Sequence, residues 1–222
     1  MTNKLSINTD DYHGFIFDMD GLLLDTERIC WECFQNACGK FGLYPDFSIY
    51  KLCLGRKAQE GNKLLAENFK GCSDFSALNE EWAERYKDHI ENNMIPVKKG
   101  VRKSLEFLSG KNIPLGVATS TERKTALKKL SKTDLYGYFS IIVTGDDVKN
   151  SKPDPEIYIL ASKMLKIDPE NCIAFEDSDN GVISAVNAGI RVIQIPDMIE
   201  PSDDIRLFGH SIVNSFNDIE LI

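Results

Sequence analysis

The stretch Phe15-Ile16-Phe17-Asp18-Met19-Asp20-Gly21 constrains the fold more than any other part of the sequence. Three apolar residues in a row, with glycines at either end, predict a short buried strand. Two aspartates follow at its carboxyl end, where an unpaired buried carboxylate is costly. Residues i and i+2 share a face of an extended chain, so both are expected to line one crevice. Taken alone, the pattern is best explained by a strand ending in a polar turn, unless other segments supply a positively charged partner.

Strand signals stop after Gly21 and return only near Pro96. The segment between them predicts helices over residues 25–40, 46–53, 57–69 and 75–92, separated by glycine and proline. An insertion of this size is too long for a loop. It predicts an all-helical domain over residues 22–95, inserted into a core made of residues 1–21 and 96–222.

Beyond Pro96 strand and helix signals alternate. Strands are expected at residues 113–118, 141–144, 172–175, 191–195 and, at the sheet edge, 210–213. Helices are expected at 100–108 and 122–130, after Asp154 as N-cap with Pro155 at the first position, and up to Ala188. The alternation predicts an α/β fold, a Rossmann-like parallel sheet with helices on both faces.

Composition narrows the class of partner. The formal net charge of −8 argues against a nucleic-acid backbone. No apolar run is long enough to span a membrane, and the first residues lack the pattern of a secretory signal, so a cytoplasmic protein is expected. Nothing demands more than a monomer. Cys30 and Cys33 form a CxxC, but no second pair or nearby histidine completes a metal site, so packing as small hydrophobes is favoured.

Polar residues follow several of the expected strands. In parallel sheets ligands bind in the crevice outside the carboxyl ends of the strands. These residues are therefore expected to meet at that crevice, here called the mouth of the sheet. They are Asp18, Asp20, Thr119, Ser120, Lys152, Glu176 and Asp177.

Four carboxylates at one mouth require a cation, and hard oxygen ligands select Mg²⁺, which keeps positions for water and substrate phosphate. A phosphate then explains Lys152 and Thr119 as a point charge and a hydrogen-bond donor. The helix expected near Glu122 would offer its N-terminal amides to the same anion.

The two aspartates suit different tasks. A carboxylate in line with phosphorus can act as nucleophile and form an aspartyl-phosphate. A second carboxyl group can protonate the leaving oxygen and then deprotonate the attacking water. Asp18 is nearer the strand and is the expected metal-bound nucleophile, which leaves Asp20 as the acid/base.

Four segments together resemble the motifs of the haloacid dehalogenase-like superfamily. They are Phe17-Asp18-Met19-Asp20-Gly21, Ala118-Thr119-Ser120, Lys152-Pro153-Asp154 and Phe175-Glu176-Asp177-Ser178. The resemblance spans about residues 12–215, and the helical insertion resembles the family's alpha-helical cap. The run FDMDGLLLDTE, with Gly181 after the fourth motif, is most similar to the beta-phosphoglucomutase and pseudouridine-5′-phosphatase group.

That resemblance implies a Mg²⁺-dependent phosphatase acting on a small phosphorylated metabolite, such as a sugar phosphate, a nucleoside monophosphate or phosphoglycolate. It implies metal ligation by Asp18, the main-chain carbonyl of Asp20, and Asp177, with Glu176 alongside. It also implies that Thr119 and Lys152 hold the phosphoryl group; Ser120 is expected to assist by a backbone amide or a helix cap. The dehalogenases lack the second aspartate, so Asp20 counts against dehalogenation.

Three questions stay open. Mutases of the group carry a histidine in the first cap helix where this chain has Cys30, which favours hydrolysis over a phosphosugar mutase. A catalytically silent binding module would be expected to lack Asp18 or Asp20, and both are present. Arg56 and Lys57 are equally a solvated helix start or a substrate-contacting loop of the cap.

Overall fold

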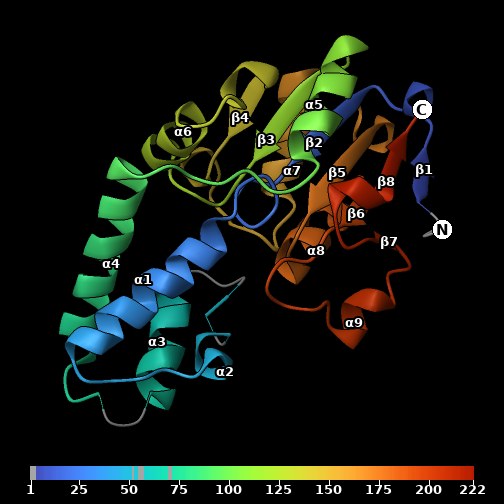
Figure 1. Cartoon of the computed structure of the whole chain (residues 1–222). Coiled ribbons are helices and arrows are strands. Elements are labelled where there is room, and N and C mark those ends of the chain that lie inside the picture. Colours follow the sequence, from blue (N-terminus) through green and yellow to red (C-terminus); the bar gives the residue numbers. More distant parts are fainter. Residues whose placement is uncertain (1–3, 52, 55–57, 70–71) are drawn as a thin grey trace. The chain divides into compact units, whose positions relative to one another are not determined.

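The computed structural model describes residues 4–51, 53–54, 58–69 and 72–222. The chain divides into two compact units, Met1–Asp25 with Ile95–Ile222, and Thr26–Met94. Residues 22–25 and Ile95, expected with the helical insertion, belong to the first unit. The strands of the described residues all belong to the first unit (Figure 1).

The first unit is built on a parallel sheet. Within the described residues six strands pair in the order β4-β3-β2-β5-β6-β7, and every pair is parallel. Their bounds are β2 Gly14–Phe17, β3 Leu115–Ala118, β4 Ile141–Val143, β5 Cys172–Glu176, β6 Arg191–Gln194 and β7 Ser211–Ile212. The predicted α/β sheet is confirmed, including the edge position of the strand around residue 211.

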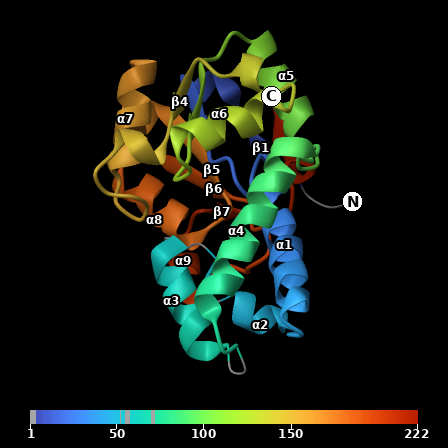
Figure 2. The ribbon, with the colours of Figure 1, turned by 90° about the vertical axis from the view of Figure 1, so that its left-hand side faces the viewer.

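Helices cover both faces of this sheet. They are α5 Val101–Gly110, α6 Arg123–Ser131, α7 Glu156–Leu165, α8 Asp179–Asn187 and α9 Asp203–Arg206. Ile16 and Ala174 point into a core that contains Tyr158 of α7 and Val182 of α8. In Figure 2 the strands lie between α7 on one side and α5 on the other.

Aromatic rings fill the opposite face of the central strands. Phe17 and Phe175 stack with ring centroids 5.0 Å apart, and Phe216 lies 5.2 Å from Phe175. All residues of β2 and β5 are buried. Because both faces are covered, the central strands are continuous apolar runs rather than alternating ones.

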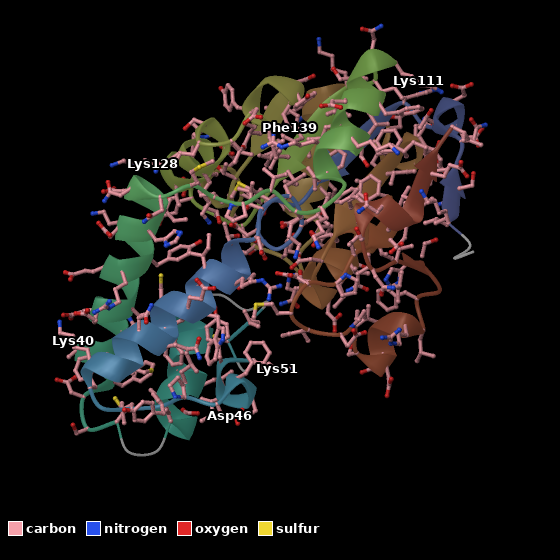
Figure 3. The ribbon with its side chains drawn as sticks, viewed as in Figure 1. Lys40, Asp46, Lys51, Lys111, Lys128 and Phe139 are labelled. Carbon is pink, nitrogen blue, oxygen red and sulfur yellow. The ribbon has the colours of Figure 1, made fainter. Side chains whose placement is uncertain are left out.

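Two short strands were missed by the sequence patterns. β1 (Leu5–Ile7) pairs in parallel with β8 (Ile219–Leu221), which joins the two ends of the chain. Lys111, which Figure 3 labels, donates from its ammonium to Oγ1 of Thr9, two residues after β1, at 2.8 Å. Strands of three residues give no usable periodicity, so only the fold reveals them.

The helical unit contains α1 Thr26–Lys40, α2 Phe47–Tyr50, α3 Ala58–Asn68 and α4 Phe75–Asn92. Phe34, Tyr50 and Leu78 belong to its core. Cys38 is buried in the same core, Cys30 packs against it, and all six cysteines are free thiols. The prediction that several cysteines pack as small hydrophobes is confirmed for Cys38 and Cys30, and Cys33 is buried as well.

Two helices differ from the prediction, one in its length and one in its first residue. The expected helix over residues 46–53 is the single turn α2, in which the Asp46 carboxylate caps Ser48 N at 2.7 Å. α7 begins one residue later than expected, with Pro155 as its N-cap, although Asp154 Oδ1 still accepts from Glu156 N at 3.0 Å.

The two segments that connect the units run side by side where they leave the sheet. Leu24 and Val97 form an antiparallel bridge, and Asp25 N donates to Pro96 O at 2.9 Å. Lys98 forms an ion pair with Asp197 in the loop after β6 and lies 3.7 Å from Asp25. The first unit therefore holds both connections together on its own surface.

Candidate active site

The carboxyl ends of three adjacent strands place the predicted residues together. β2 is flanked by β3 and β5, with Phe17 opposite Val117 on one side and Phe175 on the other. The next residues along the chain are Asp18 after β2, and Glu176 and Asp177 at the end of β5. Parallel strands in this register deliver their C-terminal residues to one edge of the sheet.

Lys152 is the centre of the charged cluster. Its Nζ lies 2.6 Å from Asp18 Oδ1 and 2.6 Å from Glu176 Oε1, and it donates to the Ala118 carbonyl at 2.9 Å. The side chains of all three charged residues are at most 10% exposed. Burial acts to lower the pKa of Lys152, but the neighbouring Asp18 and Glu176 carboxylates raise it, so the ammonium stays charged.

Three carboxylates form a candidate cation site. One carboxylate oxygen each from Asp18, Glu176 and Asp177 lie within 4.8 Å of one another. Burial raises the pKa of Asp18 to about 8; Glu176 adds to the rise and Lys152 opposes it. Without a cation, Asp18 therefore tends to keep its proton beside the single ammonium that it shares with Glu176. A divalent cation with oxygen ligands would favour the ionised form of these carboxyl groups.

Glu176 is held by several donors beneath the mouth. It is fully buried. Its Oε1 accepts from the Tyr158 hydroxyl at 2.5 Å, and its Oε2 accepts from Asp177 N at 3.2 Å. Burial and the nearby Glu176 carboxylate raise the pKa of Tyr158 well above its usual value, so this hydroxyl is a permanent donor. Tyr158 could not be predicted from its pattern, because a tyrosine on the apolar face of a helix looks like any core residue.

Two glycines give these carboxylates their space. A Cβ on Gly181 would lie 2.0 Å from Glu176 Cδ, and a Cβ on Gly21 would lie 2.3 Å from Asp177 Oδ2. Gly21 also has φ +81°, in the left-handed region that favours glycine. Both positions therefore require glycine for a reason located in the acidic cluster.

Asp20 has its own set of partners. Its Oδ1 lies 2.6 Å from Lys129 Nζ, and its Oδ2 accepts from Thr121 Oγ1 at 2.6 Å. Lys129 is 3% exposed although it lies on a helix with several other basic residues. Its neighbours on the buried face of α6 are Ala126 and Leu130. A lysine at such a helical spacing is a signal that sequence reasoning missed.

The residues expected to bind phosphate occupy the end of β3. Thr119 is buried, and its Oγ1 accepts from Thr121 N at 3.1 Å. Ser120 is exposed. A Cβ on Gly145 would lie 2.4 Å from the Ser120 carbonyl oxygen, so the next loop approaches Ser120 closely.

One backbone amide at the N-terminus of α6 is used within the chain itself. Glu122 is the N-cap without a side-chain cap bond, and Arg123 N donates to Asp146 Oδ2 at 2.7 Å. An acidic side chain of this chain already uses one of the amides that were predicted to face an anion. Arg56 and Lys57, the proposed substrate contacts, lie outside the described residues.

This chain is similar in sequence to one hydrolase family and to known phosphatases of that kind. The sequence profile described as "Haloacid dehalogenase-like hydrolase" matches residues 15–195. A phosphorylated carbohydrates phosphatase of Thermotoga maritima is 36% identical over 203 residues, which cover 91% of this chain and 86% of that protein. (DL)-glycerol-3-phosphatase 2 of Arabidopsis thaliana is 34% identical over 191 residues, covering 82% and 78%.

A solved structure supports the same grouping. A Thermotoga maritima protein assigned as a beta-phosphoglucomutase is 33% identical, with a TM-score of 0.76 over 93% of this chain and 96% of that one.

Among the described residues, no helix combines the length and the apolar character needed to cross a bilayer.

Proposed function

This chain belongs to the haloacid dehalogenase-like hydrolase family, and we propose that it is a Mg²⁺-dependent phosphatase of small phosphorylated metabolites. The observation that carries the proposal is the cluster of Asp18, Glu176 and Asp177 around one buried lysine. An anionic substrate is compatible with such a cluster only when a cation joins it.

The donor set fits Mg²⁺. Asp18, Asp177 and the main-chain carbonyl of Asp20 would hold the ion, with Glu176 alongside, which supplies hard oxygen ligands from two strand ends. When bound, the ion neutralises phosphoryl oxygens and so favours attack by an anion.

Asp18 is the proposed nucleophile. One of its carboxylate oxygens attacks phosphorus, and the bond between phosphorus and the leaving oxygen breaks with its electron pair on that oxygen. The leaving oxygen takes a proton from Asp20. Thr119, Ser120 and Lys152 hold the transferring group by hydrogen bonds and charge. The products of this half-reaction are an alcohol and a phosphorylated Asp18.

Asp20 then acts in the opposite direction. It removes a proton from water, and the water oxygen attacks phosphorus. The bond to Asp18 breaks, which releases phosphate and restores the Asp18 carboxylate with Asp20 protonated. The same residue thus serves both halves of the cycle.

The helical unit, residues 26–94, is proposed as the cap that selects the substrate. Support comes from its separate core and its insertion between Asp25 and Ile95. Arg56 and Lys57 remain candidates for substrate contact within it. Sugar and glycerol phosphates are the first substrates to try, because they are named in the relatives' activities.

The test is phosphate release from glycerol 3-phosphate, sugar phosphates, nucleoside monophosphates and phosphoglycolate. We expect release from at least one of them with Mg²⁺, no release after chelation, and recovery when Mg²⁺ is added back. Asp18→Asn should lower the rate by at least about 10³-fold while the thermal melt stays cooperative. Full activity of that variant would contradict the assignment.

A mutase is the alternative outcome of the same panel. It would interconvert sugar phosphates in the presence of a bisphosphate activator and release no net phosphate. The thiol of Cys30 cannot supply the proton transfer and hydrogen bonds of the histidine expected there in mutases, which favours hydrolysis.

A further inference from the structure

Asp20 is held by two side chains that the four family motifs do not supply. Lys129 Nζ lies 2.6 Å from Asp20 Oδ1, and Thr121 Oγ1 donates to Asp20 Oδ2 at 2.6 Å. Each oxygen of the carboxyl group therefore has a donor of its own. A group fixed through both oxygens has a defined plane as well as a defined position.

Lys129 is an unusual residue for its place in the helix. It lies on the buried face of α6 with Ala126 and Leu130, and its side chain is 4% exposed. Burying an ammonium is costly, and an apolar residue of similar size often stabilises a core better than a buried ion pair. Folding alone therefore gives little reason for a lysine here, whereas orienting Asp20 does.

We propose that Lys129, together with Thr121, is a positioning residue that orients the Asp20 carboxyl for proton transfer. The inference rests on the proposed function, in which Asp20 is the acid/base. Lys129 acts through Asp20 and needs no contact with the phosphate.

The two donors differ in a way that matters for the chemistry. An ammonium has three N–H donors and no acceptor, so Oδ1 must always accept from Lys129. A hydroxyl can donate or accept, so Thr121 can stay bonded to Oδ2 whether or not that oxygen carries the proton. The arrangement assigns the moving proton to Oδ2.

The leaving group separates this role from a structural one. Protonation by Asp20 matters for alkyl phosphates such as glycerol 3-phosphate, because an alkoxide is a poor leaving group. p-Nitrophenyl phosphate releases a stable phenolate and needs little help from an acid. An ion pair that only stabilised the fold would affect both substrates alike.

The experiment compares kcat/KM for these two substrates in Lys129→Gln, Lys129→Arg, Thr121→Val and the control Lys124→Gln. Lys124 is exposed on the same helix. If wild type does not use glycerol 3-phosphate, the sugar phosphate that it hydrolyses fastest takes its place. Lys129→Gln should lose about tenfold or more on the alkyl phosphate and less than about threefold on p-nitrophenyl phosphate. Lys129→Arg should recover much of the loss, and Lys124→Gln should match wild type.

A double-mutant cycle completes the test. In the Asp20→Asn background Lys129→Gln should cause no further loss on either substrate, because its partner is already altered. Equal losses on both substrates, or an added loss in that background, would overturn the inference. Should Lys129→Gln fail to fold, Thr121→Val gives the same comparison with less disturbance. Absence of any phosphate release by wild type would instead contradict the proposed function.

Discussion

At the scale of single residues, Gly181 has the tightest fit in the site. It lies in the first turn of α8, and a Cβ there would lie 2.0 Å from Glu176 Cδ. Glu176 is fully buried and bonded to Lys152 and Tyr158, so it has little freedom to move away.

Gly181→Ala is therefore expected to destabilise the protein by about 1–3 kcal/mol, as overpacking does in well-packed interiors. It should also impair Mg²⁺-dependent activity by displacing Glu176. Gly110→Ala is the matched control, because no atom lies within 4 Å of the position that its Cβ would take. Alanine there should be neutral or stabilising by up to about 1 kcal/mol. Thermal melts compare the two, and equal melting temperatures would contradict the steric argument.

Residue types explain which site residues were predictable. Asp18, Lys152, Glu176 and Asp177 stand out because charged residues follow buried strands. Tyr158, Thr121 and Lys129 were missed because they lie on helices or loops, where tyrosine, threonine and lysine are ordinary. Their roles depend on which helix face meets the mouth, and that is set by tertiary packing.

At the scale of elements, the edge of the sheet is tied to the end of β5 by hydrogen bonds. His210 Nε2 lies 2.8 Å from Gln194 Oε1 beside β7. Gln194 Nε2 donates to the Asp177 carbonyl and to Asp179 Oδ1, each at 3.4 Å. The side-chain oxygen of Gln194 can only accept a hydrogen bond, so Nε2 of His210 must carry the proton. In the neutral ring Nδ1 is then unprotonated, and this nitrogen is buried without a hydrogen-bond partner.

This arrangement predicts a pH dependence of stability. Burial lowers the pKa of His210, and Asp179 opposes the shift. As the pH falls below the usual histidine pKa, the unfolded chain gains a proton before the folded one, so the free energy of unfolding decreases. His210→Asn should lessen the fall in melting temperature between about pH 7.5 and 5.5.

His13→Asn is the control for this measurement, because the His13 side chain is exposed whereas that of His210 is partly buried. If His210→Asn and His13→Asn both show the same dependence of melting temperature on pH as wild type, the neutral His210 ring does not cause the fall in stability. Phosphate release at neutral pH should change little in His13→Asn.

Elements with strong local signals were predicted well. α4 occupies residues 75–92 as expected, because an N-cap aspartate and a long apolar stripe define it. α2 is shorter than its pattern suggested, and β1 and β8 gave no pattern, because three or four residues carry too few side chains to show a period. The register of β1 against β8 joins residues at opposite ends of the chain, which local sequence cannot encode.

At the scale of the whole molecule, one parallel sheet gathers residues that are far apart in the sequence. Lys152 and Asp18 are 134 positions apart, and Lys129 and Asp20 are 109 apart. The helical unit is inserted directly after the strand that carries the proposed nucleophile. The sequence could predict this organisation because strand signals stop at Gly21 and resume near Pro96, but it could not predict which helix face supplies Lys129.

The central claim is that Asp18 carries the phosphoryl group, and chemical trapping of the intermediate tests it most directly. In Asp20→Asn, p-nitrophenyl phosphate should still phosphorylate Asp18, while loss of the base slows release of phosphate. Borohydride reduction of the quenched protein converts an acyl phosphate to an alcohol, so peptide mass spectrometry should find homoserine at position 18. The signal should require both Mg²⁺ and substrate. Modification of a different residue, or none while nitrophenol is released in amounts matching the enzyme, would contradict the account.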